Sequence, residues 1–350
     1  MATGSPSASV RLHARDPVEV VEFCYEQGWA ADGLPVVPPV PWRVQQMLDA
    51  GGRAADEELG FIAFRRRRVT VGRVAANAVM AGCRPEYFPA VLACVEAMLE
   101  ERFGLHLAAA STHSPAILVV VNGPLRQQIG VNCANNALSP GWRANATIGR
   151  AIRLFLLNVC GAAPDSFDGG TMGNPAKYAY CLGEHEEASP WAPLHAERGL
   201  PPETSAVTLF AADAPRQINC RLSQDPEIIL RVIVDMMIPA GNGTSRPNEG
   251  GFLIVMSPEH ASLVGRRGGW SKAAVRRYLW EHACRPVADF KRLARVRGAL
   301  EAGDETRPLH LAEHPDDIFL AVAGSSAGLY SLIIPIQGHQ TVITKPVQRR

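Results

Sequence analysis

The chain has 350 residues and a net charge of +1, with 47% hydrophobic and 20% charged residues. This composition is typical of a globular protein with a large core, and it argues against a broad nucleic-acid surface because the basic run at residues 65–68 is only a local patch. No apolar run is long enough for a membrane span, and residues 1–10 lack the regions of a signal peptide. Eight cysteines without C-x-x-C spacing predict free thiols in a cytoplasmic protein.

Hydrophobic periodicity predicts alternating helices and strands along the chain. We expect helices over residues 16–30, 42–48, 74–82, 86–100, 145–160, 226–237, 258–264, 271–282 and 287–296. We expect strands over residues 66–71, 106–110, 117–121, 178–182, 206–211, 252–256, 318–323 and 329–335. The alternation indicates an α/β protein in which helices flank one or more mixed sheets.

A polar tip follows the predicted strands that end at Ala110, Ala211, Met256 and Ala323. This recurrence suggests a duplicated plan with two similar, interlocked lobes. We expect a disordered lead-in over residues 1–15, an N-terminal α/β lobe that carries the site over 16–200, and a C-terminal α/β lobe over 201–350.

The chain is organised around residues 131–160, where a polar loop leads into a helix. Asn145 is the expected N-cap, and an apolar stripe follows at helical spacing, formed by Ile148, Ile152, Phe155, Leu156 and Val159. Backbone N–H groups at a helix N-terminus and nearby cations hold small anions well. The alternative is a core helix whose arginines pair with acidic neighbours.

We therefore expect a substrate site for a small anionic metabolite at this loop and helix. Its polar loop side chains are Asn132, Asn135 and Asn136. The cations and helix residues expected around the anion are Arg143, Asn145, Thr147, Arg150 and Lys177.

Cys83 is the thiol with the most suggestive local sequence. It follows Gly82 and precedes Pro85 at the expected mouth of a helix, where the helix dipole and Arg84 would favour a nucleophilic thiolate. The alternative is a buried cysteine in a turn between helices. Cys133 is the second choice because it lies among amides of the organising loop that could donate to an oxyanion.

Proton transfer is predicted for a histidine at a strand end and for a group of glutamates. His113 follows a predicted strand, where ligand sites of α/β proteins gather, although a structural histidine in the turn is the alternative. Glu184 and Glu186 lie close in sequence, and carboxylates buried together raise each other's pKa. With His185 and His195 these glutamates could instead form a metal site, but their spacing matches no familiar zinc motif, so no metal or other cofactor is predicted.

Several blocks together resemble one bacterial family. They are DGLPVVPP at residues 32–39, AVMAGCRPEY at 78–87, VNGP at 121–124, RANATIGR at 143–150 and EHEEASPW at 184–191. Over nearly the whole chain the sequence resembles the large companion proteins of UGSC-type thiol or selenol proteins. The resemblance implies thiol chemistry that involves Cys83 and a small partner protein that carries cysteine or selenocysteine. His185, where the family pattern has asparagine, and the altered residues 324–331 suit a specialised biosynthetic member.

These observations predict an enzyme of small-molecule metabolism. Cys83 would attack the substrate and make or break a carbon–sulfur or other carbon–heteroatom bond, as a lyase or transferase does, while His113 with Glu184 or Glu186 moves protons. The alternatives are a thiol-dependent oxidoreductase, a substrate-binding subunit that serves a small thiol protein, and a metal-dependent hydrolase. The sequence leaves open whether the chain forms a homo-oligomer.

Overall fold

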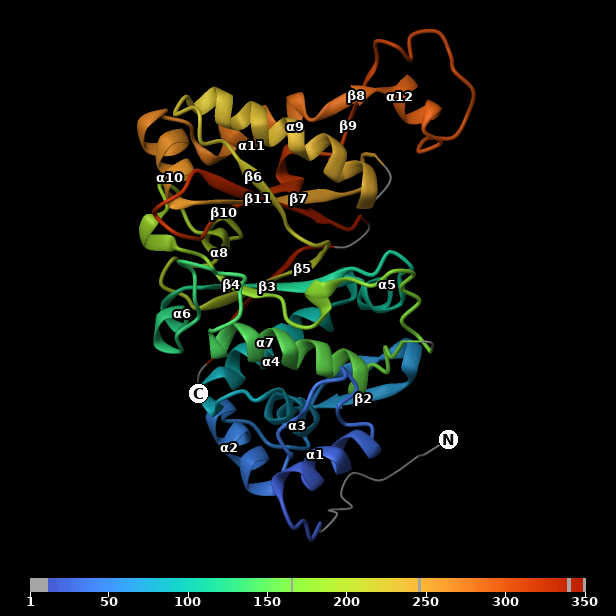
Figure 1. Ribbon diagram of the computed structural model, residues 1–350, viewed down its shortest axis with the longest axis vertical. Coiled ribbons are helices and arrows are strands. Elements are labelled where there is room, and N and C mark those ends of the chain that lie inside the picture. Colours follow the sequence, from blue (N-terminus) through green and yellow to red (C-terminus); the bar gives the residue numbers. More distant parts are fainter. Residues whose placement is uncertain (1–11, 165, 245–246, 339–340, 349–350) are drawn as a thin grey trace.

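A computed structural model describes residues 12–164, 166–244, 247–338 and 341–348. These residues form one large mixed sheet with helices on its outer faces, which confirms the α/β class (Figure 1). Among the described helices, none is both long and apolar enough to cross a membrane.

The large sheet has eight strands. Its main path runs through β10 (Ile318–Val322), β7 (Gly251–Met256), β11 (Tyr330–Ile336), β5 (Ala206–Ala212), β3 (Ala116–Asn122) and β4 (Cys181–Gly183). Two further strands pair beside this path, β6 (Arg216–Asn219) with β11 and β12 (Ile343–Pro346) with β5. Two small hairpin sheets join β1 (Glu58–Ile62) to β2 (Arg67–Thr70) and β8 (Cys284–Pro286) to β9 (Pro308–His310).

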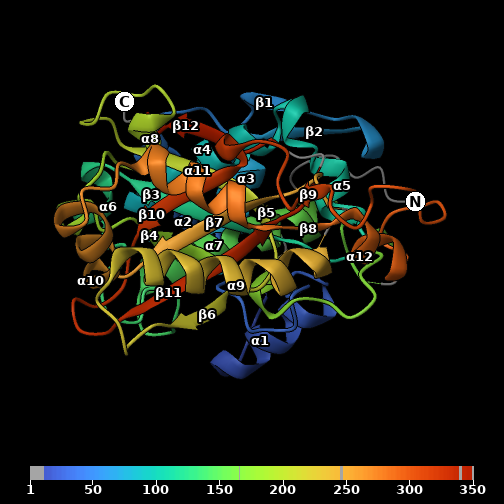
Figure 2. The same ribbon diagram turned by 90° about the horizontal axis from the view of Figure 1, so that it is seen from above.

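Helices cover both outer faces of the large sheet (Figure 1). The helices that precede β5 in the chain are α1 (Pro17–Glu26), α2 (Pro41–Gly51), α3 (Val71–Ala81), α4 (Phe88–Met98), α5 (Leu105–Ala110), α6 (Pro124–Gln128), α7 (Arg143–Leu154) and α8 (Leu194–Glu197). The later ones are α9 (Pro226–Thr244), α10 (Pro258–Ala261), α11 (Lys272–His282) and α12 (Val287–Arg292). Seen from above, α9 lies beside β11 and β6 (Figure 2).

The strand order reveals an internal duplication. In one half, β3 pairs parallel with β4 and antiparallel with β5; in the other, β7 pairs parallel with β10 and antiparallel with β11. We call β3, β4, β5 and β12 the first half and β7, β10, β11 and β6 the second half. Each half also gives a strand to the other, because β6 follows β5 but pairs with β11, and β12 follows β11 but pairs with β5. The two halves are therefore interlocked.

Corresponding positions follow from this duplication. The residue after β4, Glu184, donates its N–H to Val121, and the residue after β10, Ala323, donates its N–H to Met256. The residues after those acceptors, Asn122 and Ser257, are therefore equivalent, and each precedes a short helix.

Apolar side chains fill three layers. The halves face each other across an inter-half core that includes Leu118, Phe210, Val255, Phe319 and Ile334. The opposite face of the first half packs on α3, α4 and α7, and the opposite face of the second half packs on α9, α10 and α11. Strands β3, β5, β7 and β10 are buried on both faces, which is why the sequence shows them as apolar runs without alternation.

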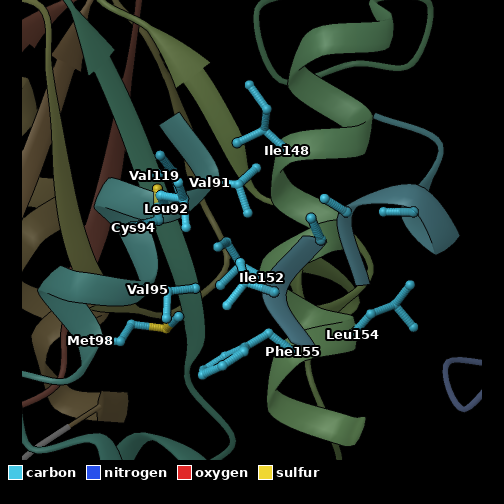
Figure 3. Packing of buried hydrophobic residues seen from close by; sticks show 14 of the residues in the cluster. Val91, Leu92, Cys94, Val95, Met98, Val119, Ile148, Ile152, Leu154 and Phe155 are labelled. Atoms are coloured by element: carbon cyan, nitrogen blue, oxygen red, sulfur yellow. The ribbon is translucent and has the colours of Figure 1, made fainter. Parts of the chain in front are cut away.

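The apolar stripe predicted on the organising helix is confirmed. Ile148, Ile152 and Phe155 are buried and face Val91 and Val95 of α4 (Figure 3). α7 also packs against α3, β3 and β4, so residues beyond this stripe are buried.

Two local predictions are wrong. Residues 106–110, predicted as a strand, belong to helix α5, because Gly104 turns the chain in a left-handed conformation (φ +68°) and the alanines that follow favour a helix. Asn145 is not an N-cap: α7 begins at Arg143, and the buried Asn145 side chain has other partners.

Gly149 permits the close approach of α7 to the segment before β4. A Cβ atom at this position would lie 2.5 Å from Tyr180 N and 3.1 Å from the carbonyl carbon of Ala179. Gly149→Ala should therefore lower the free energy of unfolding by about 1–3 kcal/mol, although helix propensity alone would raise it by about 1 kcal/mol. Urea unfolding measures the difference, with Ala146→Ser on the exposed side of the helix as the control. A more stable Gly149→Ala variant would contradict this packing.

Candidate functional site

A cavity of about 430 Å³ opens between the two halves. Its wall combines residues at the ends of β7 and β10, the start of β11, and the organising loop. Hydroxyl and amide groups come from Asn136, Ser139, Gln217, Ser257, Ser325 and Tyr330, and apolar surface comes mainly from Leu138, Leu182, Val255 and Leu332. No charged side chain is among the described residues of this wall.

The location of the cavity follows from the topology. The carboxyl ends of the parallel pairs β3–β4 and β7–β10 meet at this end of the sheet, where His185 N donates to the Val322 carbonyl (2.7 Å). Ligands of α/β proteins bind at the carboxyl ends of strands, because the connections there leave the sheet in different directions. The cavity thus lies where the fold favours a site.

Beside the cavity lies a buried carboxylate. Glu184 follows β4 and is fully buried; its Oε2 accepts from Asn122 Nδ2 (2.7 Å) and from Leu194 N (2.8 Å). Its Oε1 has no hydrogen-bond partner among the described residues. Burial raises the pKa of Glu184, and the positive charge of Lys272 only partly opposes this shift. A carboxyl group in this environment keeps its proton to a higher pH than an exposed one does.

Glu186 joins the same hydrogen-bond network. Its Oε1 accepts from Asn122 Nδ2 (3.0 Å) and from Gly123 N (2.6 Å), and it lies 4.0 Å from Arg126 Nε. The structure therefore brings together Glu184 and Glu186, two of the four predicted catalytic residues, through the amide of Asn122.

Arg126 connects this network to a thiol. Its Nη1 lies 3.0 Å from Cys133 Sγ and its Nη2 lies 2.5 Å from Glu187 Oε1. Burial raises the pKa of the Cys133 thiol, and the guanidinium charge and hydrogen bond of Arg126 oppose that shift. We call Asn122, Arg126, Cys133, Glu184, Glu186 and Glu187 the polar cluster. Cys133 also borders the cavity wall, because its carbonyl accepts from Gly324 N (2.8 Å).

The organising loop is held by Asn145. This buried side chain accepts from Asn132 N (2.8 Å) and donates to the carbonyls of Asn132 (3.0 Å), Cys181 (3.2 Å) and Ala137 (3.4 Å). Asn132 in turn donates to the Asn135 carbonyl (2.8 Å). Of the three predicted loop asparagines, Asn136 lies in the cavity wall, Asn132 shapes the loop together with the helix residue Asn145, and Asn135 is exposed and not part of the described wall.

The predicted cations do not converge on an anion site. Arg150 is paired with Asp32 (2.6 and 3.0 Å), Lys177 with Asp168 (2.7 Å), and Arg143 donates to the Gly82 carbonyl (2.9 Å). The pairing of Arg150 with Asp32 matches the alternative stated for this helix, in which its arginines pair with acidic neighbours. Thr147 donates to the Arg143 carbonyl within α7, so its hydroxyl is also engaged.

Cys83 lies in a different part of the molecule. It is buried in the turn after α3, and its Sγ contacts only the Thr147 carbonyl (3.3 Å) among its hydrogen-bond partners in the described chain. Burial raises its pKa to about 12, although the Thr147 contact and the Arg143 charge act in the opposite direction. The nearby charge that lowers this pKa is that of Arg143 and not the expected Arg84, and burial outweighs both this charge and the Thr147 contact, which argues against the expected thiolate at Cys83.

His113 is far from the glutamates. His113 precedes β3, whereas Glu184 lies beside the carboxyl end of that strand. Because β3 has seven residues in extended conformation, the two residues lie about 20 Å apart. The prediction of a shared proton-transfer site for His113 and Glu184 is wrong, because the segment before His113 is a helix and His113 lies at the amino end of the next strand.

The residues of the predicted metal alternative do not form a ligand set. Within the described part of the chain, no three His, Cys, Asp or Glu side chains converge as metal ligands. His195 Nε2 faces the Pro202 carbonyl (3.1 Å), and Glu186 is held by Gly123 N–H and Asn122.

Local sequence reasoning missed Asn122 and Arg126. Asn122 belongs to a quoted sequence block but carries no chemical signal until β3 and β4 are known to be neighbours. Arg126 resembles any surface arginine of a short helix, yet only 4% of its surface is exposed. The sequence Val121-Asn122-Gly123-Pro124 does contain a clue to the site. Asn122 is a polar residue at the carboxyl end of an apolar strand, which is where ligands bind in α/β sheets.

No protein-family model matches this sequence, and a search of curated proteins finds no match. The chemical meaning of the site therefore depends on its geometry alone.

Asn145 should contribute strongly to stability through its loop contacts. Asn145→Ala would remove the partner of the buried Asn132 N–H and a donor to the Cys181 carbonyl, while the Asn132 carbonyl still accepts from Gly183 N; we expect a loss of about 2–3 kcal/mol in the free energy of unfolding. Asn135→Ala, at an exposed loop position, should change it by less than about 0.5 kcal/mol. Equal effects in urea unfolding would contradict the role assigned to Asn145.

Glu184 should make stability depend on pH. Because its pKa is raised in the folded protein, its contribution is fully present below about pH 4.5, the unfolded value, and is lost as pH rises toward the folded pKa. Glu184→Gln should therefore gain stability relative to the wild type as pH rises from 4.5 to 8. Unfolding curves across this range test it, with exposed Glu313→Gln as the control. Parallel profiles for the wild type and Glu184→Gln would refute the raised pKa.

Proposed function

We propose that this protein is an enzyme of small-molecule metabolism that binds its substrate in the cavity between the two halves and acts on it through the thiolate of Cys133. The observation that carries this proposal is the contact of Cys133 Sγ with Arg126 Nη1 at 3.0 Å, at a residue whose carbonyl accepts from Gly324 N of the cavity wall. An adjacent cation stabilises a thiolate, which is the nucleophilic form of cysteine.

Burial raises the pKa of all eight thiols, Cys133 included, so the choice of Cys133 depends on its contact with Arg126. All eight cysteines are described and free, and Cys133 is the one with a hydrogen-bonding cation among the described residues. Burial raises the pKa of Cys160 to about 12 and that of Cys94 well above its ordinary value. Eight free thiols also fit a reducing compartment, so we propose a cytoplasmic location.

The cavity wall favours an uncharged, hydrogen-bonding portion of the substrate. Its described side chains offer hydroxyl and amide groups together with apolar surface, and no lysine or arginine. The expectation of a wholly anionic metabolite is no longer supported. Arg143, Arg150 and Lys177, which would have bound it, already have partners within the protein. Arg126 is the cation nearest to the reactive thiol and could meet a single negative group there.

The proposed step forms and breaks one bond at carbon. The Cys133 thiolate forms a carbon–sulfur bond with an electrophilic carbon, and the bond from that carbon to a heteroatom breaks, so that the leaving group departs with the bonding electrons. A protonated carboxyl of Glu184 supplies the proton that the leaving group takes up. Transfer of the carbon group from Cys133 to a second nucleophile would complete a transferase cycle.

Reactivity of Cys133 toward iodoacetamide tests this proposal. Since burial raises the thiol pKa, labelling should accelerate as pH rises beyond about 9. Arg126→Gln removes the stabilising charge and should slow labelling at pH 8 by about tenfold, one pKa unit. Glu187→Gln removes the carboxylate that competes for Arg126 and should accelerate it, because the negative charge of Glu187 raises the Cys133 pKa.

Peptide-level mass spectrometry separates Cys133 from the other seven thiols, and Cys83→Ala is the control variant. Labelling of Cys83 ahead of Cys133, or equal rates in Arg126→Gln and Glu187→Gln, would overturn the proposal. Turnover that needs Cys133 and also a second protein would point to the substrate-binding subunit that serves a small thiol or selenol partner.

A further inference from the structure

The guanidinium of Arg126 has one edge that the protein uses only in part. Arg126 is 4% exposed, and its Nη1 contacts Cys133 Sγ. The edge away from this contact presents Nε and Nη2 side by side. Nη2 donates to Glu187 Oε1, whereas Nε is buried and has no hydrogen-bond partner among the described residues. A buried donor of a charged group without a partner is costly, so this edge is suited to a further acceptor.

Arg150 shows how the same edge binds a carboxylate elsewhere in this protein. Its Nε donates to Asp32 Oδ2 (2.6 Å) and its Nη2 donates to Asp32 Oδ1 (3.0 Å), so both donors meet the two oxygens of one carboxylate. Such two-point pairing is strong and directional. At Arg126 only one of the two corresponding donors makes a hydrogen bond.

Glu186 does not complete the edge of Arg126. Its Oε1 is 4.0 Å from Arg126 Nε, which is beyond hydrogen-bond distance, and it accepts from Gly123 N (2.6 Å) and Asn122 Nδ2 (3.0 Å). These two donors hold the Glu186 carboxylate away from the guanidinium. The Nε donor is therefore left for a group that lies outside the polar cluster.

Glu187 reaches Arg126 from the surface. Its side chain is 50% exposed, and its Oε1 also accepts from the side chain of exposed Gln127 (2.6 Å). An ion pair with a partner this exposed contributes little to stability, so it can be exchanged at low cost. The position of Glu187 shows that a carboxylate can reach this edge from solvent. Exchange for another carboxylate leaves the charge around the guanidinium unchanged.

We infer that Arg126 binds the carboxylate group of a small substrate through Nε and Nη2, and that Glu187 occupies part of this place in the free protein. Nη1 of the same guanidinium contacts Cys133 Sγ, so a carbon bonded to the bound carboxylate lies close to the thiol. The substrate class is therefore a short carboxylic acid whose electrophilic carbon is next to the carboxylate. The inference rests on the proposed function, because it names the substrate group that lies beside Cys133.

Iodoacetate and iodoacetamide test this inference because they differ in one group. With both reagents the thiolate forms a carbon–sulfur bond and iodide leaves, but only iodoacetate carries a carboxylate next to the reacting carbon. The measured quantity is the ratio of the iodoacetate rate to the iodoacetamide rate at Cys133, obtained by peptide mass spectrometry. The thiol pKa affects both rates alike and cancels in the ratio. The reference is the same ratio for Cys133 in the urea-unfolded protein.

In the folded protein we expect this ratio to exceed the unfolded reference by about tenfold or more. Glu187→Gln removes the competing carboxylate and should raise the ratio a further two- to fivefold, roughly. Arg126→Gln should return it to the reference, and Arg126→Lys, which keeps the charge but lacks the paired donors, should lower it toward the reference. Exposed Glu313→Gln should leave it unchanged.

A ratio at folded Cys133 no greater than the unfolded reference, or the same ratio in Glu187→Gln and the wild type, would overturn the inference and leave the thiol chemistry of the proposed function intact. Both readouts retain Arg126, so they do not depend on whether Arg126→Gln folds. If neither reagent labels Cys133, the proposed function fails instead. Titration of the Arg126 Nε–H resonance with sodium acetate then decides the inference: a saturable shift that sodium chloride does not reproduce supports it, and no shift overturns it.

Discussion

The apolar layer between the two halves of the sheet is the constraint on which the rest of this structure depends. Phe210 of the first half meets Phe319 of the second edge to face, with ring centroids 5.4 Å apart, and both are buried in the inter-half core. Such a contact adds to the burial of two large rings. Because β6 and β12 are exchanged between the halves, separating them would break strand pairing as well as this packing.

This constraint positions the candidate site. With the halves fixed face to face, the carboxyl ends of β3, β4, β7 and β10 meet, and the polar residues that follow them are buried together. Glu184 shows the energetic consequence: an ionised carboxylate there would lack a partner for one oxygen, and its raised pKa reflects that cost. Buried polar groups of this kind are common where a protein binds or transforms a ligand.

The sequence predicted the type of each helix or strand better than it predicted which elements lie side by side. The strands around Val119, Leu209 and Ile254 are apolar runs whose type can be read locally, and the stripe on α7 has clear helical spacing. Pairing between β3 and β4 joins residues about sixty positions apart, so the contact of Asn122 with Glu184 has no local signal. Arg150 is an example of a misleading local pattern. Its sequence surroundings suggest an anion site, but its side chain is paired with Asp32, which lies 118 residues earlier in the chain. Desolvation of Cys83 likewise depends on distant packing, which a turn motif does not reveal.

A crystallographic screen with small uncharged fragments that carry hydroxyl and amide groups tests most directly whether function resides at this end of the sheet. Bound fragments should gather between the organising loop and residues 324–331, in contact with Asn136 and Tyr330. Fragments that instead cluster beside Cys83 and Arg143, with the inter-half cavity empty, would contradict it.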